Sequence, residues 1–274
     1  MSINIDELKE IALNVYEKIH PILGTESAAK TSTRGAGGDI TMYIDTLAEN
    51  IIIDGLKELG TNLLLISEEV GEKYIGNREE ALKNKQVLII DPIDGSNNSV
   101  RGIPYSSVSI AYAEGTHMRD IIRAIVVNLY TGDLYWAEKG LGAYLNDQKI
   151  YVSNHNISDK PFFEFNITPR NITKNLERLD PIISKFHRIR ILGSTALSLC
   201  QVASGSMEAF INLRKSNRLV DTAAGFLILK EADGKIFSLE GREIDLELGI
   251  NKRFSFIACN AQIEGFLRKN LINK

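Results

Sequence analysis

The stretch that most constrains the fold of this chain covers residues 86–99 and reads QVLIIDPIDGSNNS. Residues 87–90 are continuously apolar and rich in β-branched side chains, which predicts a short buried strand. Asp91 and Asp94 follow at the carboxyl end of this strand. Pro92 lies between them and has no amide hydrogen to donate, so we expect the strand to stop before it.

Residues 95–98 (GSNN) predict a flexible turn whose backbone amides can face an anion. Asp91 and Asp94 beside such a turn would repel the anion unless cations lie between them, so this is the outline of a divalent-metal phosphate site. The alternative is that both are turn formers, since Asp-Pro and Asp-Gly are common turn dipeptides. Glu68 and Glu69 end the preceding apolar segment, and clustered acids at strand ends favour the metal interpretation.

The composition narrows the class of protein. The 274 residues carry a net charge of −3, which gives no electrostatic case for nucleic acid or an anionic membrane as partner. No apolar run approaches the roughly 20 residues that span a bilayer, and residues 1–19 form an amphipathic helix pattern rather than a signal peptide. The two cysteines are interpreted as buried thiols, so we expect a cytoplasmic protein.

Periodicity predicts two parts of different architecture. In residues 1–155 we expect an N-terminal α+β domain with two helices and a largely antiparallel sheet, and in residues 156–274 a C-terminal α/β domain. Helices are predicted at 5–23, 42–59, 195–204, 220–232 and 261–271. Strands are predicted at 63–66, 87–90, 106–114, 121–128, 134–137, 162–167, 188–192, 209–213, 236–237 and 254–258.

Three further groups of polar residues have a functional and a structural interpretation. Asp39 and Thr41 follow a glycine-rich loop and either cap a helix or bring an acid and a hydroxyl to a metal-bound water. Asp221 either caps an apolar helix or binds metal. Arg214 and Arg218 belong to a basic run that is either a solvated loop or a clamp for phosphate.

Three motifs, in this order, resemble the lithium-sensitive phosphatase superfamily of inositol monophosphatases and fructose-1,6-bisphosphatases. They are Glu68-Glu69, Asp91-Pro92-Ile93-Asp94-Gly95-Ser96 and Val220-Asp221-Thr222-Ala223-Ala224-Gly225. The resemblance extends over about residues 5 to 270 and implies a layered αβαβα sandwich. The family's usual Trp and Thr are replaced by Val220 and Ser96.

The resemblance also implies the site. Mg²⁺ would be the cofactor, with two or three ions per active site and Mn²⁺ as a substitute. The implied ligands are Glu68, Asp91, the backbone carbonyl of Ile93, Asp94 and Asp221. Asp39 would help Thr41 or Ser96 polarise the attacking water, and the phosphate would rest on the amides of Gly95 and Ser96.

Substrate choice is implied by the segment before Asp221. Inositol monophosphatases typically have a Glu seven residues before this Asp, whereas this chain has Arg214, which can bind a second phosphate. Residues 212–218 resemble those of archaeal fructose-1,6-bisphosphatases, which commonly hydrolyse inositol monophosphates too. We therefore expect hydrolysis of fructose-1,6-bisphosphate to fructose-6-phosphate, a reaction of gluconeogenesis, with inositol-1-phosphate as second substrate. Arg218 and Ser194 are expected as further substrate contacts.

Other interpretations remain open at this stage. Inositol-1-phosphate could be the main substrate, or the enzyme could act on 3′-phosphoadenosine 5′-phosphate or NADP. A non-catalytic metal- and phosphate-binding regulator is disfavoured by the intact set of carboxylates. The resemblance also implies a homodimer or homotetramer, because members of that family form dimers or larger oligomers.

Overall fold

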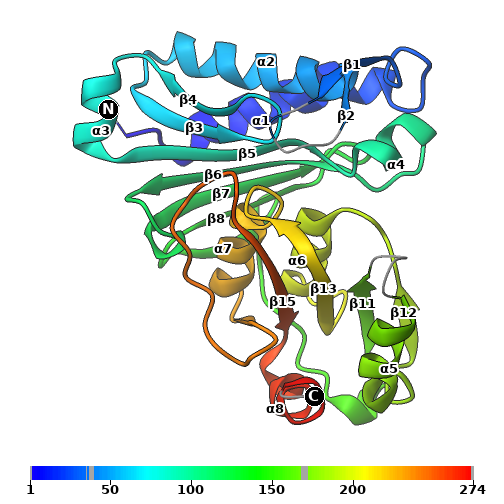
Figure 1. Cartoon of the computed structure of the whole chain (residues 1–274). Coiled ribbons are helices and arrows are strands. Elements are labelled where there is room, and N and C mark those ends of the chain that lie inside the picture. Colours follow the sequence, from blue (N-terminus) through cyan, green and yellow to red (C-terminus); the bar gives the residue numbers. More distant parts are fainter. Residues whose placement is uncertain (1, 35, 37–39, 168–171, 273–274) are drawn as a thin grey trace.

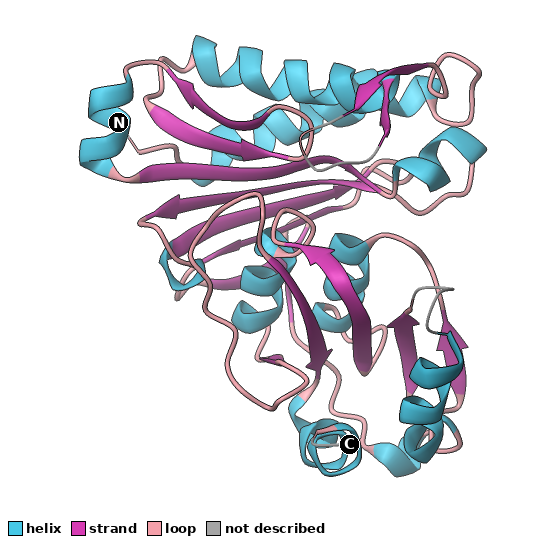
Figure 2. Cartoon of the chain, viewed as in Figure 1, coloured by secondary structure: helices cyan, strands magenta, loops and turns pink. Residues whose placement is uncertain are grey.

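The computed structural model describes residues 2–34, 36, 40–167 and 172–272. Helices and sheets alternate in five layers, so the predicted αβαβα sandwich is confirmed (Figure 1; Figure 2). Three hydrophobic cores fill the spaces between successive layers. Among the described residues, none of the helices has the length and apolar character needed to cross a bilayer.

The outer layer consists of α1 (Ile5–Ile19) and α2 (Tyr43–Glu58), which cover one face of the first sheet (Figure 1). The side chain of Asn4 accepts hydrogen bonds from the amides of Asp6 and Glu7, and Glu7 accepts from the Asn4 amide, so a capping box starts α1. The helix ends one turn earlier than predicted, and the 3₁₀-helix η1 (His20–Ile22) accommodates Pro21.

The first sheet has eight strands in the order β10-β9-β8-β7-β6-β5-β3-β4. All neighbouring pairs are antiparallel except β3 and β5, which run parallel. The strands are β3 (Leu63–Ser67), β4 (Gly71–Ile75), β5 (Gln86–Asp94), β6 (Ser107–Glu114), β7 (Ile121–Asn128), β8 (Leu134–Glu138), β9 (Gly142–Leu145) and β10 (Gln148–Ile150). The short helices α3 (Arg78–Asn84), α4 (Ser96–Arg101) and η2 (Met118–Asp120) lie in its connections.

The expectation that the central strand stops before Pro92 is wrong. β5 continues to Asp94 and pairs with β6 at Asp91↔Ser109 and Asp94↔Ser107, with a register shift between the two pairs. A bulge leaves residues unpaired, so a proline without an amide hydrogen is tolerated within it. Both faces of β5 are buried along its whole length.

The middle layer consists of α6 (Thr195–Ala203) and α7 (Ala223–Glu231), which lie between the two sheets (Figure 1). Almost all of their side chains are buried, as expected for helices that pack against a sheet on both sides. α7 begins at Ala223, so Asp221 precedes the helix rather than lying in its first turn.

The second sheet has five strands in the order β12-β11-β13-β15-β14. They are β11 (Phe162–Asn166), β12 (Arg188–Arg190), β13 (Ala209–Arg218), β14 (Lys235–Phe237) and β15 (Arg253–Cys259). Two helices, α5 (Ile172–Ile183) and α8 (Ala261–Leu271), cover its outer face; α5 was not predicted. β1 (Thr31–Arg34) and β2 (Ile40–Met42) form a separate hairpin, and η3 (Ile157–Asp159) lies in the polar segment where the domain boundary stays a prediction.

Candidate metal and phosphate site

A cavity of about 490 Å³ opens where the ends of β3 and β5 meet segments of the second half of the chain. It contains most of the residues that the sequence singles out. Its lining is Met42, Asp45, Glu68, Glu69, Asp91, Ile93, Asp94, Gly95, Ser96, Asn97, Asn166, Gly193, Thr195, Arg214, Arg218 and Asp221.

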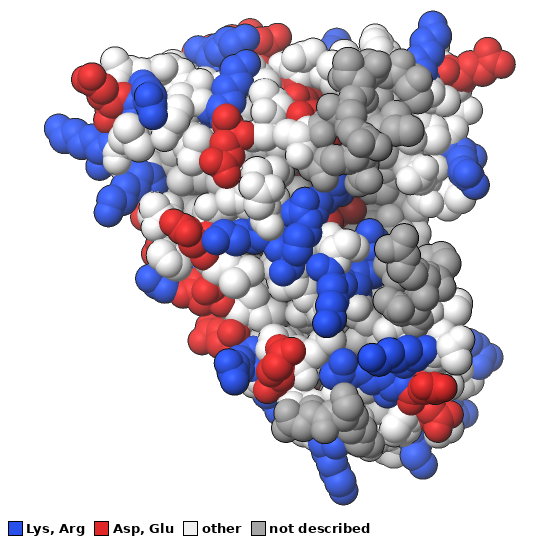
Figure 3. Space-filling view, in the orientation of Figure 1, with Lys and Arg blue, Asp and Glu red and all other residues white. Residues whose placement is uncertain are grey.

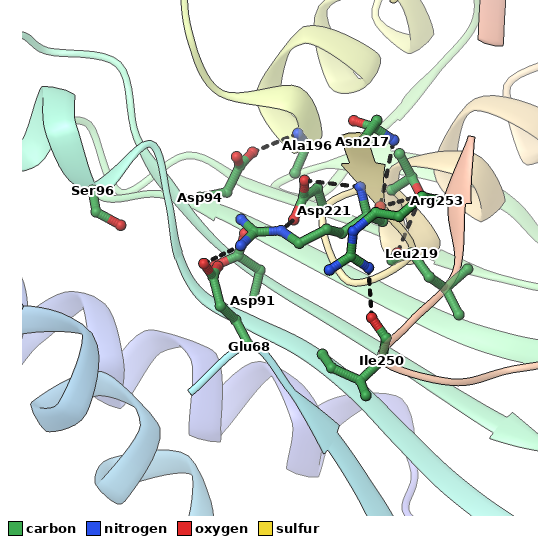
Figure 4. Close-up of polar contacts among 12 residues, drawn as sticks. Glu68, Asp91, Asp94, Ser96, Ala196, Asn217, Leu219, Asp221, Ile250 and Arg253 are labelled. Atoms are coloured by element: carbon green, nitrogen blue, oxygen red, sulfur yellow. Dashed lines mark hydrogen bonds and ion pairs between the residues drawn. The ribbon is translucent and has the colours of Figure 1, made fainter. Parts of the chain in front are cut away.

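Three carboxylates converge in this cavity (Figure 4). Glu68, Asp91 and Asp221 each offer an oxygen, and these oxygens lie within 4.8 Å of one another. The parallel register of β3 and β5 explains why Glu68 and Asp91 are close, because Ser67 lies beside Ile90 and the next residue along the chain is an acid in both cases. All three residues are buried.

Arg218 lies against this carboxylate trio. Its Nη1 forms a short ion pair with Glu68, and its Nε lies 3.0 Å from Oδ1 of Asp221. The side chain is only 16% exposed, and the neighbouring acids raise the pKa of the guanidinium against the opposing effect of burial. Arg218, which was predicted to contact the substrate, instead pairs with the carboxylates of Glu68 and Asp221 in this structure.

Burial and mutual repulsion make Glu68 and Asp91 reluctant to ionise. Burial, opposed by the charge of Arg218 and reinforced by that of Asp221, raises the pKa of Glu68 to about 8. Burial, together with the charges of Glu68 and Asp94, also raises the pKa of Asp91 well above its usual range. Buried carboxylate oxygens at this spacing suit a hard divalent cation, so the trio can hold a metal ion.

Asp94 faces a different set of partners. Its Oδ2 accepts hydrogen bonds from Ser194 Oγ at 2.7 Å and from the amide of Ala196 at 2.6 Å. Burial raises the pKa of Asp94 to about 7, with Asp221 adding to the rise and these hydrogen bonds opposing it. Ser194, predicted as a substrate contact, is thus bonded to a predicted metal ligand.

Ser96 lies at the start of α4, with its Oγ 2.8 Å from Oδ1 of Asp45 and 2.9 Å from the carbonyl oxygen of Ile93. Gly95 precedes it with φ +96°, and a Cβ there would lie 3.0 Å from the carbonyl oxygen of Tyr105. A residue without a side chain is therefore required at this turn.

Sequence reasoning missed Asp45. It is 4% exposed, lines the cavity and accepts a hydrogen bond from the Met42 amide at 2.9 Å. Burial raises its pKa to about 6, and the bonds from Met42 and Ser96 oppose the rise. The signal was available, since Asp45 and Glu49 lie on the same face of α2 as Ile52 and Leu56.

Glu49 forms hydrogen bonds on both sides of the turn that carries Glu68 and Glu69. It accepts a short hydrogen bond from Ser67 Oγ and another from the amide of Val70 at 3.1 Å. Because these two donors flank Glu68 and Glu69, the Glu49 carboxylate fixes the turn that directs Glu68 toward Asp91.

Arg214 also faces the cavity. Its Nε is buried and has no hydrogen-bond partner among the described residues. An unpaired buried donor is costly, so the arrangement suits an anionic ligand that supplies the missing acceptor.

Asp39 lies outside the described residues, and Thr41 lies in β2. Lys and Arg side chains gather across the middle of the face drawn in Figure 3. Such a basic surface favours the approach of an anionic substrate.

Comparison with known proteins gives consistent matches along the chain. The sequence model described as "Inositol monophosphatase family" matches residues 4–269. A fructose-1,6-bisphosphatase/inositol-1-monophosphatase from Methanothermobacter thermautotrophicus is 37% identical over 255 residues, which cover 91% of this chain and 89% of that protein.

A bifunctional NADP phosphatase/NAD kinase from Methanococcus maripaludis is 35% identical over 277 residues, or 94% of this chain. The match covers 48% of that protein, so the chain spans about half its length. A crystal structure of an inositol monophosphatase–fructose 1,6-bisphosphatase superimposes with a TM-score of 0.84 at 29% identity, covering 97% of this chain and 98% of the other.

Proposed function

The chain is a phosphatase that belongs to the inositol monophosphatase family, and we propose that its main substrate is fructose-1,6-bisphosphate, with inositol-1-phosphate as a second substrate. The relative from Methanothermobacter thermautotrophicus carries both activities in its name. The proposal further includes Mg²⁺ as the cofactor, in two or three sites, with Mn²⁺ as a substitute.

The unpaired Nε of Arg214 carries the substrate proposal. Arg214 and the carboxylate trio line the same cavity, so one ligand with two phosphates can contact both the guanidinium and metal ions held by the trio. A guanidinium binds a phosphate through parallel hydrogen bonds, whereas it offers no acceptor to inositol hydroxyls. The second phosphate would therefore be recognised at Arg214 and the first at the reaction centre.

The donor set supports Mg²⁺. Glu68, Asp91 and Asp221 offer hard carboxylate oxygens, and Asp94 and the carbonyl of Ile93 line the same cavity. When bound, Mg²⁺ would supply positive charge to the phosphate oxygens and lower the pKa of a water molecule. The carboxylates of this chain hold and space the ions.

The remaining roles belong to the chain's own polar groups. The Ser96 hydroxyl is oriented by Asp45, and a buried carboxylate with a pKa of about 6 can accept a proton through that hydroxyl. Gly95 and Ser96 line the cavity where the phosphate would rest. Asp39 and Thr41 remain proposed contributors to orienting the attacking water.

NADP is the competing substrate, because the relative from Methanococcus maripaludis includes an NADP phosphatase. Its 2′-phosphate and pyrophosphate would also offer acceptors to the Arg214 guanidinium and to metal ions held by the acidic lining. Initial rates on fructose-1,6-bisphosphate, inositol-1-phosphate, NADP and 3′-phosphoadenosine 5′-phosphate separate the candidates. A tenfold or greater preference for either nucleotide would overturn the sugar-phosphate proposal.

Arg214→Glu is the decisive variant. It should raise KM for fructose-1,6-bisphosphate about tenfold or more while leaving turnover of inositol-1-phosphate comparatively intact, since only the bisphosphate needs the cation. Lys215→Glu is the matched control, because Lys215 is the adjacent exposed cation and does not line the cavity. Equal loss on both substrates would contradict the role given to Arg214.

We also propose a cytoplasmic homodimer or homotetramer. Both cysteines are buried free thiols, as suits a reducing compartment. Ile103 and Ile191 are 46% and 62% exposed, and Asn98 links their segments, since its carbonyl accepts from the Ile103 amide and its Nδ2 donates to the carbonyl of Leu192. Light scattering on the wild type and on Ile191→Asp would test whether this apolar pair is covered by a second copy.

A further inference from the structure

Glu164 is a carboxyl group buried in the second sheet, away from the carboxylate trio. It lies in β11 between Phe163 and Phe165 and is only 1% exposed. A carboxyl in such surroundings costs free energy unless it makes compensating hydrogen bonds. The hydrogen-bond partners of Glu164 therefore indicate its structural role.

The first partner is the backbone of Leu192. Oε1 of Glu164 accepts a hydrogen bond from the Leu192 amide at 2.9 Å. On the other side of this residue, the Leu192 carbonyl accepts from Nδ2 of Asn98 at 2.8 Å, and the same Nδ2 lies 2.8 Å from the carbonyl of Tyr105. Leu192 is thus held between the second sheet and α4.

The residues that follow Leu192 in the chain include the hydrogen-bond partners of Asp94. Gly193 follows with φ +94°, and a Cβ there would lie 3.1 Å from Nδ2 of Asn98. The next residue, Ser194, and the amide of Ala196 both donate to Oδ2 of Asp94. A short and closely packed segment therefore connects Glu164 with Asp94.

We propose that Glu164 is a positioning residue that holds residues 192–196, and through them Asp94, in the geometry that binds the metal ion. The inference rests on the proposed function only in taking Asp94 as a metal ligand. Glu164 acts through the Leu192 amide and needs an acceptor at Oε1, not a negative charge.

The second oxygen supports this assignment. Oε2 of Glu164 and the hydroxyl of Tyr105 are buried without a hydrogen bond of good geometry within the described part of the chain, and Ser198 is the side-chain donor that interacts with both groups. Burial raises the pKa of Glu164 to about 7, so the neutral acid is well populated near neutral pH. Glutamine reproduces the acceptor and the shape of that neutral acid.

The test is calorimetric titration of the full chain with Mg²⁺ alone, without substrate. Glu164→Ala should weaken Mg²⁺ binding about 10- to 100-fold, the usual effect of losing an outer partner of a metal ligand. Glu164→Gln should restore most of the affinity. Glu164→Asp keeps the charge but withdraws the oxygen by one methylene, so it should behave like the alanine variant even if alanine prevents folding.

Glu208, which immediately precedes β13, provides a matched control. It is 3% exposed and accepts a hydrogen bond from the amide of Phe162, the first residue of β11, at 2.6 Å. Glu208→Ala should lower Tm without changing Mg²⁺ affinity. Wild-type affinity in Glu164→Asp, or an equal loss in Glu208→Ala, would overturn the proposal, whereas an error in the proposed substrate would show only in wild-type turnover.

Discussion

Glu68 and Asp221 come from different halves of the chain, yet both bind the guanidinium of Arg218. A single cation of the protein thus pairs with two members of the trio proposed to hold metal. A metal ion that binds to the trio must then either bind beside this guanidinium or displace it. The balance between the two cations can be measured.

Arg218→Ala should lower the free energy of unfolding of the metal-free protein by about 3 kcal/mol, because it leaves buried carboxylates unpaired. Saturating Mg²⁺ should then raise Tm more in the variant than in the wild type, since the ion supplies the missing charge. Differential scanning calorimetry in EDTA and in Mg²⁺ measures both effects. Arg119→Ala removes an exposed ion pair and serves as the control. An identical Mg²⁺-induced shift in Arg218→Ala and wild type would contradict this account.

Stability of the metal-free protein should fall as pH rises. The folded-state pKa values of Asp45, Asp94 and Glu68 are raised to about 6, 7 and 8. Between their unfolded and folded pKa values the folded chain binds more protons, so its stability decreases with pH across about pH 4 to 8. Tm in EDTA should therefore be higher at pH 5 than at pH 8, and Glu68→Gln should reduce the slope. A Tm that rises over this range would count against the raised values.

Asp94→Asn should abolish most Mg²⁺-dependent turnover while changing Tm little. The asparagine oxygen can still accept from Ser194 and Ala196, but it lacks the charge that a divalent cation requires. Steady-state rates across a Mg²⁺ titration measure the effect, with the exposed Asp6→Asn as control. Retention of wild-type Mg²⁺-dependent turnover would show that the proposed mechanism is wrong.

Asp45→Asn and Ser96→Ala should each lower kcat about 100-fold with little change in KM, because they remove a group that relays a proton. The double variant should be no worse than either single one if the two residues act as a unit. Asp54→Asn, on the exposed face of the same helix, is the control. Additive losses would mean that the two residues act separately.

Gly225→Ala should destabilise the fold by about 1–3 kcal/mol through overpacking. A Cβ at residue 225 in α7 would lie 2.6 Å from Cδ1 and 2.8 Å from Cβ of Leu199 in α6. Urea denaturation gives the difference. Gly265→Ala in α8 is the control, because nothing lies within 4 Å of its added Cβ and helix propensity favours alanine. Equal stability of the two variants would refute the close packing of α6 and α7.

The layered fold and the convergence of acids were predictable because they depend on local signals. Apolar periodicity located most strands, and Glu68 and Asp91 both follow an apolar strand segment. Their adjacency needs only that β3 and β5 run parallel in the observed register.

Other features depend on contacts between distant segments and were not predictable. Nothing near Arg218 in the sequence shows that it pairs with Glu68. The hydrogen bond from Ser96 to Asp45 joins α4 to α2 across 51 residues and cannot be read from either segment alone. Helix α5 was missed because Pro181 interrupts it, although Ile172, Leu176, Leu179 and Ile182 recur at helical spacing.

The register shift in β5 has a consequence for how this site can vary. Side chains alternate along a strand, so two residues three apart normally point to opposite faces. Here Asp91 and Asp94 pair with Ser109 and Ser107, which are two apart and share a face. The bulge absorbs the extra residue and so turns both carboxylates toward the helices of the middle layer. A change that removed the bulge but kept the three-residue spacing would leave both aspartates in the sequence and still send one to the wrong side.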